Sequence, residues 1–175
     1  LGGRMKNNIG VMQGRLLPKY KGRYQAHPVG YWQQEFEVAQ KSGLDCIEFI
    51  LDYNDAERNP LLKECGIDEI KSIISKTSVN VNTICADYFM EAPLHSKETS
   101  IFKKSQEVMI QLLSNAANLG VSDVVIPCVD HSSLDGGKNT DRFVLQLSPL
   151  VSMAEKLGIN LSLETDLAPK PFLEL

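Results

Sequence analysis

Polar and ionisable side chains recur at the ends of five predicted β-strands, at a spacing of about 38 residues, the size of a βα unit. In chain order they are Gln13 and Arg15, Glu48 and Asp52, Asp87 and Tyr88, Asp130 and His131, and Glu164 and Asp166. Because the carboxyl ends of parallel strands meet at one edge of a sheet, we expect these side chains to share one rim. Carboxylates and a histidine on such a rim can bind a divalent cation, transfer a proton or hydrogen-bond sugar hydroxyls.

Glu164 is the favoured catalytic and metal-binding candidate. It ends the fifth predicted strand and shares a face of that strand with Ser162, while Leu161 and Leu163 occupy the other face. A carboxylate in this place can bind a divalent cation or act as a base. The alternative is a glutamate that caps a loop or forms a salt bridge.

Four further residues are candidate substrate ligands or pocket residues together with Arg15. Glu48 lies within an apolar strand, where an unpaired charge is costly, so we expect it to meet a cation, Arg15 or a substrate hydroxyl. A structural ion pair is the alternative. His131 can bind metal, shuttle a proton or hydrogen-bond a sugar, or it is a plain loop histidine. Gln13 and Asp87 complete the predicted substrate-binding set.

The elements that must position these residues alternate between strand and helix. The predicted strands cover 8–13, 46–50, 79–86, 124–129 and 159–164, and the predicted helices cover 32–42, 67–76, 102 to Gly120, and 140–157. Pro149 lies inside the last helix and predicts either a kink or two successive helices. Pro127 lies in the fourth strand, near its carboxyl end, where the loss of one ladder donor is easier to accept.

Three predicted helices end in the same motif, a glycine followed by an aliphatic residue that leads into a strand. The glycines are Gly43, Gly120 and Gly158. This rhythm predicts an α/β protein with a parallel sheet. We favour a (β/α)₈ TIM-barrel type over a doubly wound open sheet, because no G-x-G-x-x-G follows the first strand. Eight units would need roughly 300 residues, so the sequence is expected to hold only the first five units of a truncated or incomplete barrel, or a chain that pairs with a second copy.

Composition narrows the function classes. Residues 1–4 precede Met5 and are interpreted as a tag remnant, leaving 5–175 as the N-terminal portion of a barrel. The formal net charge of −4 argues against nucleic-acid binding. No apolar run is long enough to span a bilayer, and no secretory signal is visible, so a cytoplasmic location without a membrane partner is predicted. The four cysteines form no C-x-x-C pair and are expected to be reduced structural thiols.

Four segments together carry a resemblance to a known family. They are IGVMQGRL at 9–16, IEF at 47–49, IPCVD at 126–130 and LETDL at 163–167. In this order and spacing they resemble the sugar phosphate isomerase/epimerase family, which has a xylose isomerase-like TIM barrel and is related to endonuclease IV. The similarity runs from about Met5 to the last residue, a length that would contain five of the eight βα units of such a barrel.

The resemblance implies a divalent cation (Mn²⁺, Mg²⁺, Co²⁺ or Zn²⁺) at the barrel mouth. Glu164 matches the ligand glutamate that members draw from the fifth strand. The other usual ligands come from strands six to eight, which this sequence does not contain, so the site is expected to be incomplete in this chain. Lys170 stands where ketose 3-epimerases of the group usually carry a substrate-binding glutamate six residues after the ligand glutamate.

The expected function is therefore metal-dependent isomerisation or epimerisation of a small sugar or sugar derivative through an enediolate. Glu164 would be a metal ligand, with Glu48, His131 and Arg15 lining the pocket. The alternative is a non-catalytic sugar-binding or assembly protein, possible as a homodimer that covers the open sheet edges. An endonuclease-IV-like phosphodiesterase is less favoured, because Asp87 and Tyr88 stand where a histidine would follow the third strand.

Overall fold

The computed structural model describes residues 7–134 and 137–175, so the predicted tag remnant at 1–4 lies outside the described residues. Five strands form one sheet in chain order, and each neighbouring pair is parallel. The strands are β1 (Gly10–Met12), β2 (Cys46–Ile50), β3 (Thr83–Cys85), β4 (Asp123–Cys128) and β5 (Asn160–Thr165). The predicted parallel α/β fold is confirmed. The first and third strands are shorter than predicted.

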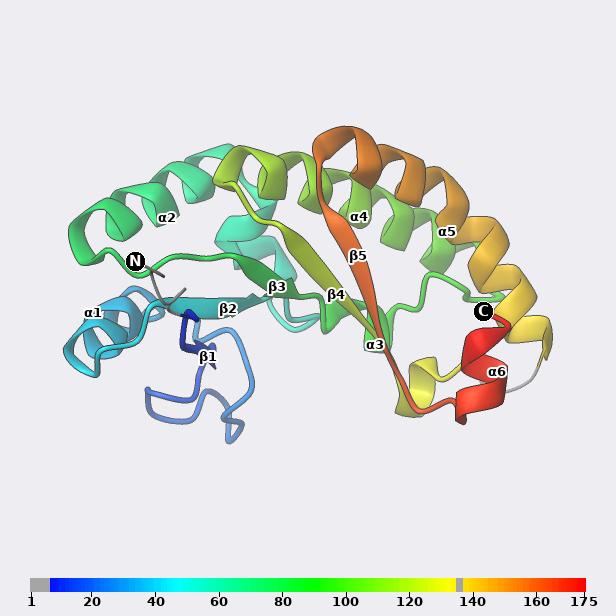
Figure 1. Ribbon diagram of the computed structural model, residues 1–175, viewed down its shortest axis with the longest axis horizontal. Helices are drawn as coiled ribbons and strands as arrows, with labels where there is room; N and C mark the ends of the chain where they lie inside the picture. Colours follow the sequence, from blue (N-terminus) through cyan, green and yellow to red (C-terminus); the bar gives the residue numbers. More distant parts are fainter. Residues whose placement is uncertain (1–6, 135–136) are drawn as a thin grey trace, which may run out of the picture.

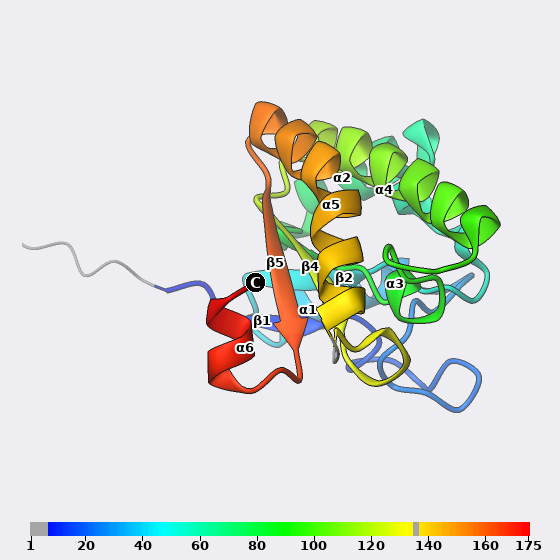
Figure 2. The ribbon, with the colours of Figure 1, turned by 90° about the vertical axis from the view of Figure 1, so that its right-hand side faces the viewer.

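Helices connect the strands. They are α1 (Gln33–Lys41), α2 (Glu64–Thr77), α3 (Tyr88–Glu91), α4 (Thr99–Leu119), α5 (Gly137–Leu157) and α6 (Pro169–Leu173), with 3₁₀ turns η1 (Ala56–Arg58), η2 (Pro60–Leu62) and η3 (Asp130–Ser132). The long helices α2, α4 and α5 cover one face of the sheet (Figure 1). In a view turned by 90°, these helices lie together on one side of β4 and β5 (Figure 2). Among the described residues, no helix is long and apolar enough to cross a membrane.

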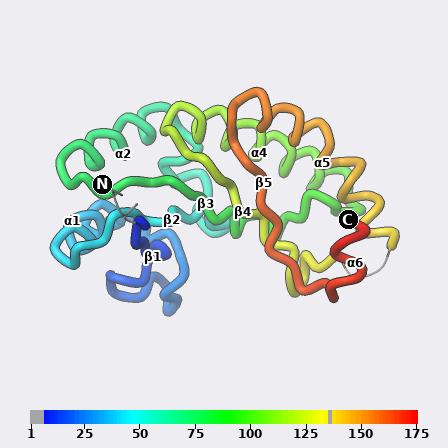
Figure 3. The backbone as a smooth tube through the Cα atoms, in the orientation of Figure 1, coloured from blue at the N-terminus to red at the C-terminus, as the bar shows by residue number. Residues whose placement is uncertain are grey.

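The predicted helices are confirmed, with changes at their ends. Pro149 lies inside α5, which is one helix from Gly137 to Leu157, so the prediction of two successive helices is wrong. The turns η1, η2 and η3 and the short helices α3 and α6 were not predicted. The glycines at 43, 120 and 158 all have φ between 71° and 83°, as the helix-exit pattern predicts. The chain thus runs from β1 at one end of the sheet to β5 and α6 at the other (Figure 3).

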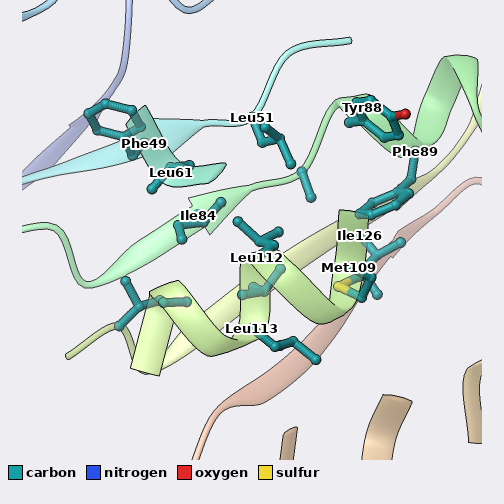
Figure 4. Close-up of a cluster of buried hydrophobic side chains, with 14 of the residues drawn as sticks. Phe49, Leu51, Leu61, Ile84, Tyr88, Phe89, Met109, Leu112, Leu113 and Ile126 are labelled. Carbon is teal, nitrogen blue, oxygen red and sulfur yellow. The ribbon is translucent and has the colours of Figure 1, made fainter. Parts of the chain in front are cut away.

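The core lies between the sheet and the long helices. Phe49, Ile84 and Ile126 come from three successive strands and are buried together with Met109 and Leu112 of α4 (Figure 4). Burial of such side chains contributes roughly 1.5–3 kcal/mol each. Because side chains alternate along a strand, the residues between these apolar ones face away from the helices. That second face carries the candidate site.

A buried carboxylate holds the loop that follows β1. Glu35 on α1 is fully buried, and its two oxygens accept the backbone N–H of Gly14 at 2.8 Å and one accepts that of Leu16 at 3.0 Å. Burial raises the pKa of Glu35, and these backbone hydrogen bonds oppose the rise. Gly14 has φ +85°, and an added Cβ would lie 2.1 Å from the carbonyl oxygen of Tyr24. The turn therefore requires glycine for both its conformation and its space.

Gly14→Ala and Gly30→Ala form a matched pair that tests this turn. Both glycines have positive φ, but an added Cβ at Gly30 would meet nothing within 4 Å. We expect Gly14→Ala to lower the free energy of unfolding by about 1–3 kcal/mol more than Gly30→Ala, which is the cost of forcing extra atoms into packed structure. Urea denaturation of the two variants measures the difference. Equal losses would show that the loop moves aside freely.

Candidate functional site

Strand register gathers polar side chains into one row at the carboxyl ends of β3 to β5. Pro127 is the register partner of Glu164, and Val125 is the partner of Cys85. Asp87 follows the end of β3 by two residues, so continuing the register places it near Pro127, in the row that ends at Glu164. A backbone hydrogen bond of 2.8 Å from Tyr88 to Leu51 continues the β2–β3 pairing and brings Asp52 to the same row. The predicted common rim is present for these strands.

Cys85 lies beneath this row, and the charges of the row affect the pKa of its thiol. Its thiol donates to Asp87 Oδ1 at 3.1 Å. Burial raises the pKa of the Cys85 thiol, and the negative charges of Asp87, Glu48 and Glu164 raise it further. Three carboxylates from three different strands therefore act on one buried group. The charges of Glu48, Asp87 and Glu164 therefore all act on the Cys85 thiol.

The surroundings of Asp87 raise the pKa of its carboxyl group. Burial raises its pKa, and the charges of Asp52 and Glu164 add to the rise, while hydrogen bonds from Cys85 and Gln25 oppose it. A carboxyl group whose pKa moves toward neutral exchanges a proton more readily at physiological pH. A role of Asp87 in binding substrate stays a prediction.

A hairpin from the loop after β1 docks on this rim. Lys21 and Gly22 both have positive φ, the conformation of a type I′ turn, between the mutually hydrogen-bonded Tyr20 and Arg23. Arg23 Nη2 lies 2.6 Å from Oδ2 of the nearly buried Asp52. Lys21 Nζ lies 2.7 Å from Asp55, which also accepts from the Tyr20 hydroxyl. The charge of Asp52 is thus already paired within the chain.

The two strand glutamates have no such partner in the part of the chain that the structure describes. Glu164 is exposed and Glu48 is half-buried. Within residues 7–134 and 137–175, neither carboxylate forms a hydrogen bond or an ion pair, so the structural ion pair considered for Glu48 is not observed there. Arg15, one of its expected partners, instead donates through Nη2 to Gln25 Oε1 at 3.2 Å. Both glutamates are free to meet a ligand.

Gln13 and His131 lie away from this convergence. Gln13 follows β1 on the face that carries Ile47 and Phe49 and has no exposed surface. Its Oε1 accepts from the backbone N–H of Ile50 at 3.0 Å and contacts His27 Nδ1 at 3.2 Å. These contacts are structural, and a substrate-binding role for Gln13 stays a prediction. His131 is exposed on η3, and its role is likewise a prediction.

A divalent cation needs several oxygen or nitrogen ligands gathered around one point. Among the residues that the structure describes, no three His, Cys, Asp or Glu side chains gather closely enough to hold a metal ion. Strand geometry gives the reason, because β4 separates Asp87 from Glu164, which places their backbones about 10 Å apart. Asp52 is occupied by Arg23. Glu164 can supply one ligand, but the described residues do not complete a cation site.

Sequence reasoning missed two residues of the site. Cys85 lies two residues before Asp87, so strand alternation alone places both on one face. Gln25 touches Asp87 and Arg15 from a long loop, where no periodic pattern could indicate it.

Comparisons with known proteins agree with the parallel α/β fold described above. Residues 36–171 match the model of a family described as xylose isomerase-like TIM barrel. This match covers most of the chain, and the protein belongs to that family. No curated protein matches the sequence significantly.

Solved structures share the fold. D-psicose 3-epimerase from Clostridium cellulolyticum H10, with D-tagatose, has a TM-score of 0.67 and 18% identity over 89% of this chain and 51% of its own. The 3-keto-D-glucoside 4-epimerase of E. coli has a TM-score of 0.64 and 17% identity over 90% of this chain and 56% of its own. A Mycobacterium smegmatis xylose isomerase-like TIM barrel protein, in complex with magnesium, has a TM-score of 0.60 and 16% identity over 89% and 54%. The chain spans about half the length of these proteins, and its fold is part of such a barrel.

His27 makes the stability of this region depend on pH. It is buried between Trp32 and Phe49, and burial lowers its pKa from 6.5 to about 4, although Asp52 and Asp55 oppose the change. The unfolded chain therefore binds more protons than the folded chain between pH 6.5 and 4. Stability should be complete above pH 6.5 and fall by on the order of 3 kcal/mol as pH drops through that window.

The variant His27→Asn tests this pH dependence, because it cannot titrate and retains a donor toward Gln13. We expect a shallower loss of unfolding free energy between pH 7 and 4.5 than in the wild type, measured by urea denaturation at each pH. Identical slopes in the two proteins would exclude His27 as the source.

Proposed function

We propose that the protein acts as an isomerase or epimerase on a small sugar or sugar derivative. Membership of the xylose isomerase-like family and structural likeness to sugar epimerases support this class. The observation that carries the proposal is the parallel register of β3 to β5, which aligns Asp87 and Glu164 at the carboxyl ends of the strands, where the Cys85 thiol donates to Asp87 Oδ1 at 3.1 Å. Carboxylates in that place can bind sugar hydroxyls and transfer protons.

In the proposed reaction, a base removes a proton from the carbon next to the substrate's carbonyl group. The intermediate is an enediolate, and a proton then returns to it. Glu164 is exposed and unpaired among the described residues, so it can reach a substrate carbon or contribute a ligand to a cation. Asp87, with its raised pKa, is suited to hold the substrate hydroxyl whose proton must move. Glu48 can accept a further hydroxyl, while Arg15, His131 and Gln13 remain proposed pocket residues.

A divalent cation of the Mn²⁺, Mg²⁺, Co²⁺ or Zn²⁺ class would polarise the carbonyl and stabilise the enediolate when bound. Glu164 is the proposed ligand. Because the described residues do not complete such a site, the steps proposed above are those of the chain's own side chains.

A non-catalytic sugar-binding or assembly protein is the second candidate. In that case Glu48 and Glu164, which form no hydrogen bond or ion pair among the described residues, would bind sugar hydroxyls without a reaction following. A cytoplasmic location without nucleic-acid or membrane partners completes the proposal, and an endonuclease-like role has no supporting feature beyond the family relationship.

Proton exchange with solvent tests the proposal directly. Incubation of the protein with a panel of ketoses and aldoses in D₂O, with each of the four cations, should incorporate deuterium at the carbon beside the carbonyl, detected by NMR. Glu164→Gln should lower the exchange rate by about a hundredfold or more, within the range for loss of a general base. Glu155→Gln, an exposed carboxylate on α5, is the matched control and should leave the rate unchanged.

Two results separate the candidates. Saturable sugar binding without deuterium incorporation would favour the non-catalytic protein. Exchange that survives Glu164→Gln would reject the role proposed for that residue.

A further inference from the structure

A second pocket lies between the loop after β2, α3 and the first turns of α4. Its volume is about 240 Å³, and its wall includes Tyr53, Tyr88, Glu91, Ser100, Ile101 and Lys104. None of these residues belongs to the row of carboxylates described above. The pocket's two tyrosines nevertheless directly follow Asp52 and Asp87 in sequence, and their ring centroids lie 5.2 Å apart. The pocket is therefore separate from the proposed catalytic site but adjoins the same strand ends.

Tyr88 gives this pocket an unused hydrogen-bond donor. Its side chain is only 6% exposed, yet its hydroxyl forms no hydrogen bond with any residue that the structure describes. The hydroxyl points away from the apolar cluster that contains Phe89 and Leu112 (Figure 4). Burial, together with the neighbouring Tyr53, raises the pKa of Tyr88, so the phenol keeps its proton at neutral pH. The hydroxyl oxygen is not among the buried side-chain atoms that lack a partner, so solvent reaches it and a molecule in the pocket can accept its hydrogen bond.

The first turn of α4 adds further donors. Glu98, which precedes this 21-residue helix, makes no side-chain hydrogen bond to it. In the described part of the chain, no acceptor bonds the backbone N–H groups of Thr99, Ser100 and Ile101. Unpaired amides and the aligned peptide dipoles make such a helix end favourable for an anion. Ser100 and Ile101 of this turn line the pocket together with Tyr88.

The pocket wall carries one positively charged and one negatively charged side chain, Lys104 and Glu91. Lys104 is one turn further along α4, and its ion pair with Glu107, at 3.5 Å, is between two exposed side chains and therefore weak. Glu91 is the carboxylate on the wall and opposes an anion. The remaining wall is mainly aromatic and aliphatic, which suits a flat ring.

We propose that this pocket binds the phosphate or carboxylate group of a small molecule whose ring packs against Tyr53 and Tyr88. The Tyr88 hydroxyl, the first-turn amides of α4 and Lys104 would donate to the oxyanion. The proposal is independent of the isomerase function, because it uses none of the residues assigned to that reaction.

Phenyl phosphate is the probe, with inorganic phosphate and phenol for comparison, and backbone amide resonances of the protein are followed by NMR. We expect saturable shifts at Thr99, Ser100 and Ile101 with phenyl phosphate, and weaker binding of inorganic phosphate. Tyr88→Phe keeps the ring and removes the donor, and it should weaken phenyl phosphate binding about tenfold or more. Lys104→Gln, at an exposed position, should also weaken it, while Glu91→Gln should strengthen it.

The controls decide what the pocket recognises. Glu37→Gln alters an exposed carboxylate on α1 and should leave the affinity unchanged. Phenol that binds as tightly as phenyl phosphate would overturn the proposal, because the pocket would then recognise the ring alone. Absence of saturable shifts at the α4 amides, or unchanged affinity in both Tyr88→Phe and Lys104→Gln, would also overturn it.

Discussion

Parallel pairing of β3, β4 and β5 in fixed register is the constraint on which the rest of the structure depends. A slip of one residue would turn every side chain of a strand to the other face. In the observed register, Val124, Ile126 and Cys128 of β4 are buried beside the helices. The same register leaves Cys85, Asp87 and Glu164 on the opposite face. Burial of the apolar set therefore selects the register, and the polar set is positioned as a consequence.

The loop after β1 depends on a different interaction, the buried carboxylate of Glu35. A charge without surface exposure is stable only where donors surround it. Gly14 and Leu16 supply those donors, and Gly14 lets the chain turn close to the carbonyl of Tyr24. The hairpin at Tyr20–Arg23 can then reach Asp52 and Asp55. Helix α1 thus organises one wall of the rim without contributing a residue to it.

Sequence patterns within one strand or helix predicted the features that depend on neighbouring residues alone. The period-two alternation in the fifth strand placed Glu164 opposite Leu161 and Leu163, and both leucines do contact the α5 side. Pro127 is tolerated in β4 because it is the second-last residue of that strand. Gln13 was harder to place, because β1 is only three residues long and the face of the residue beyond it is set by contacts with Ile50 and His27. Such long-range contacts leave no periodic signal in sequence.

The electrostatics of the strand ends differ on their two sides. On the side of the carboxylate row, Asp87 and Glu164 raise the pKa of Cys85, which means that another negative charge would be unfavourable there. A neutral sugar or a cation suits that environment better than a phosphate group. On the helical side, the Tyr88 hydroxyl and the first backbone N–H groups of α4 have no acceptor within residues 7–134 and 137–175. Because Asp87 and Tyr88 are consecutive residues, the row of carboxylates and the proposed anion site are adjacent along the backbone.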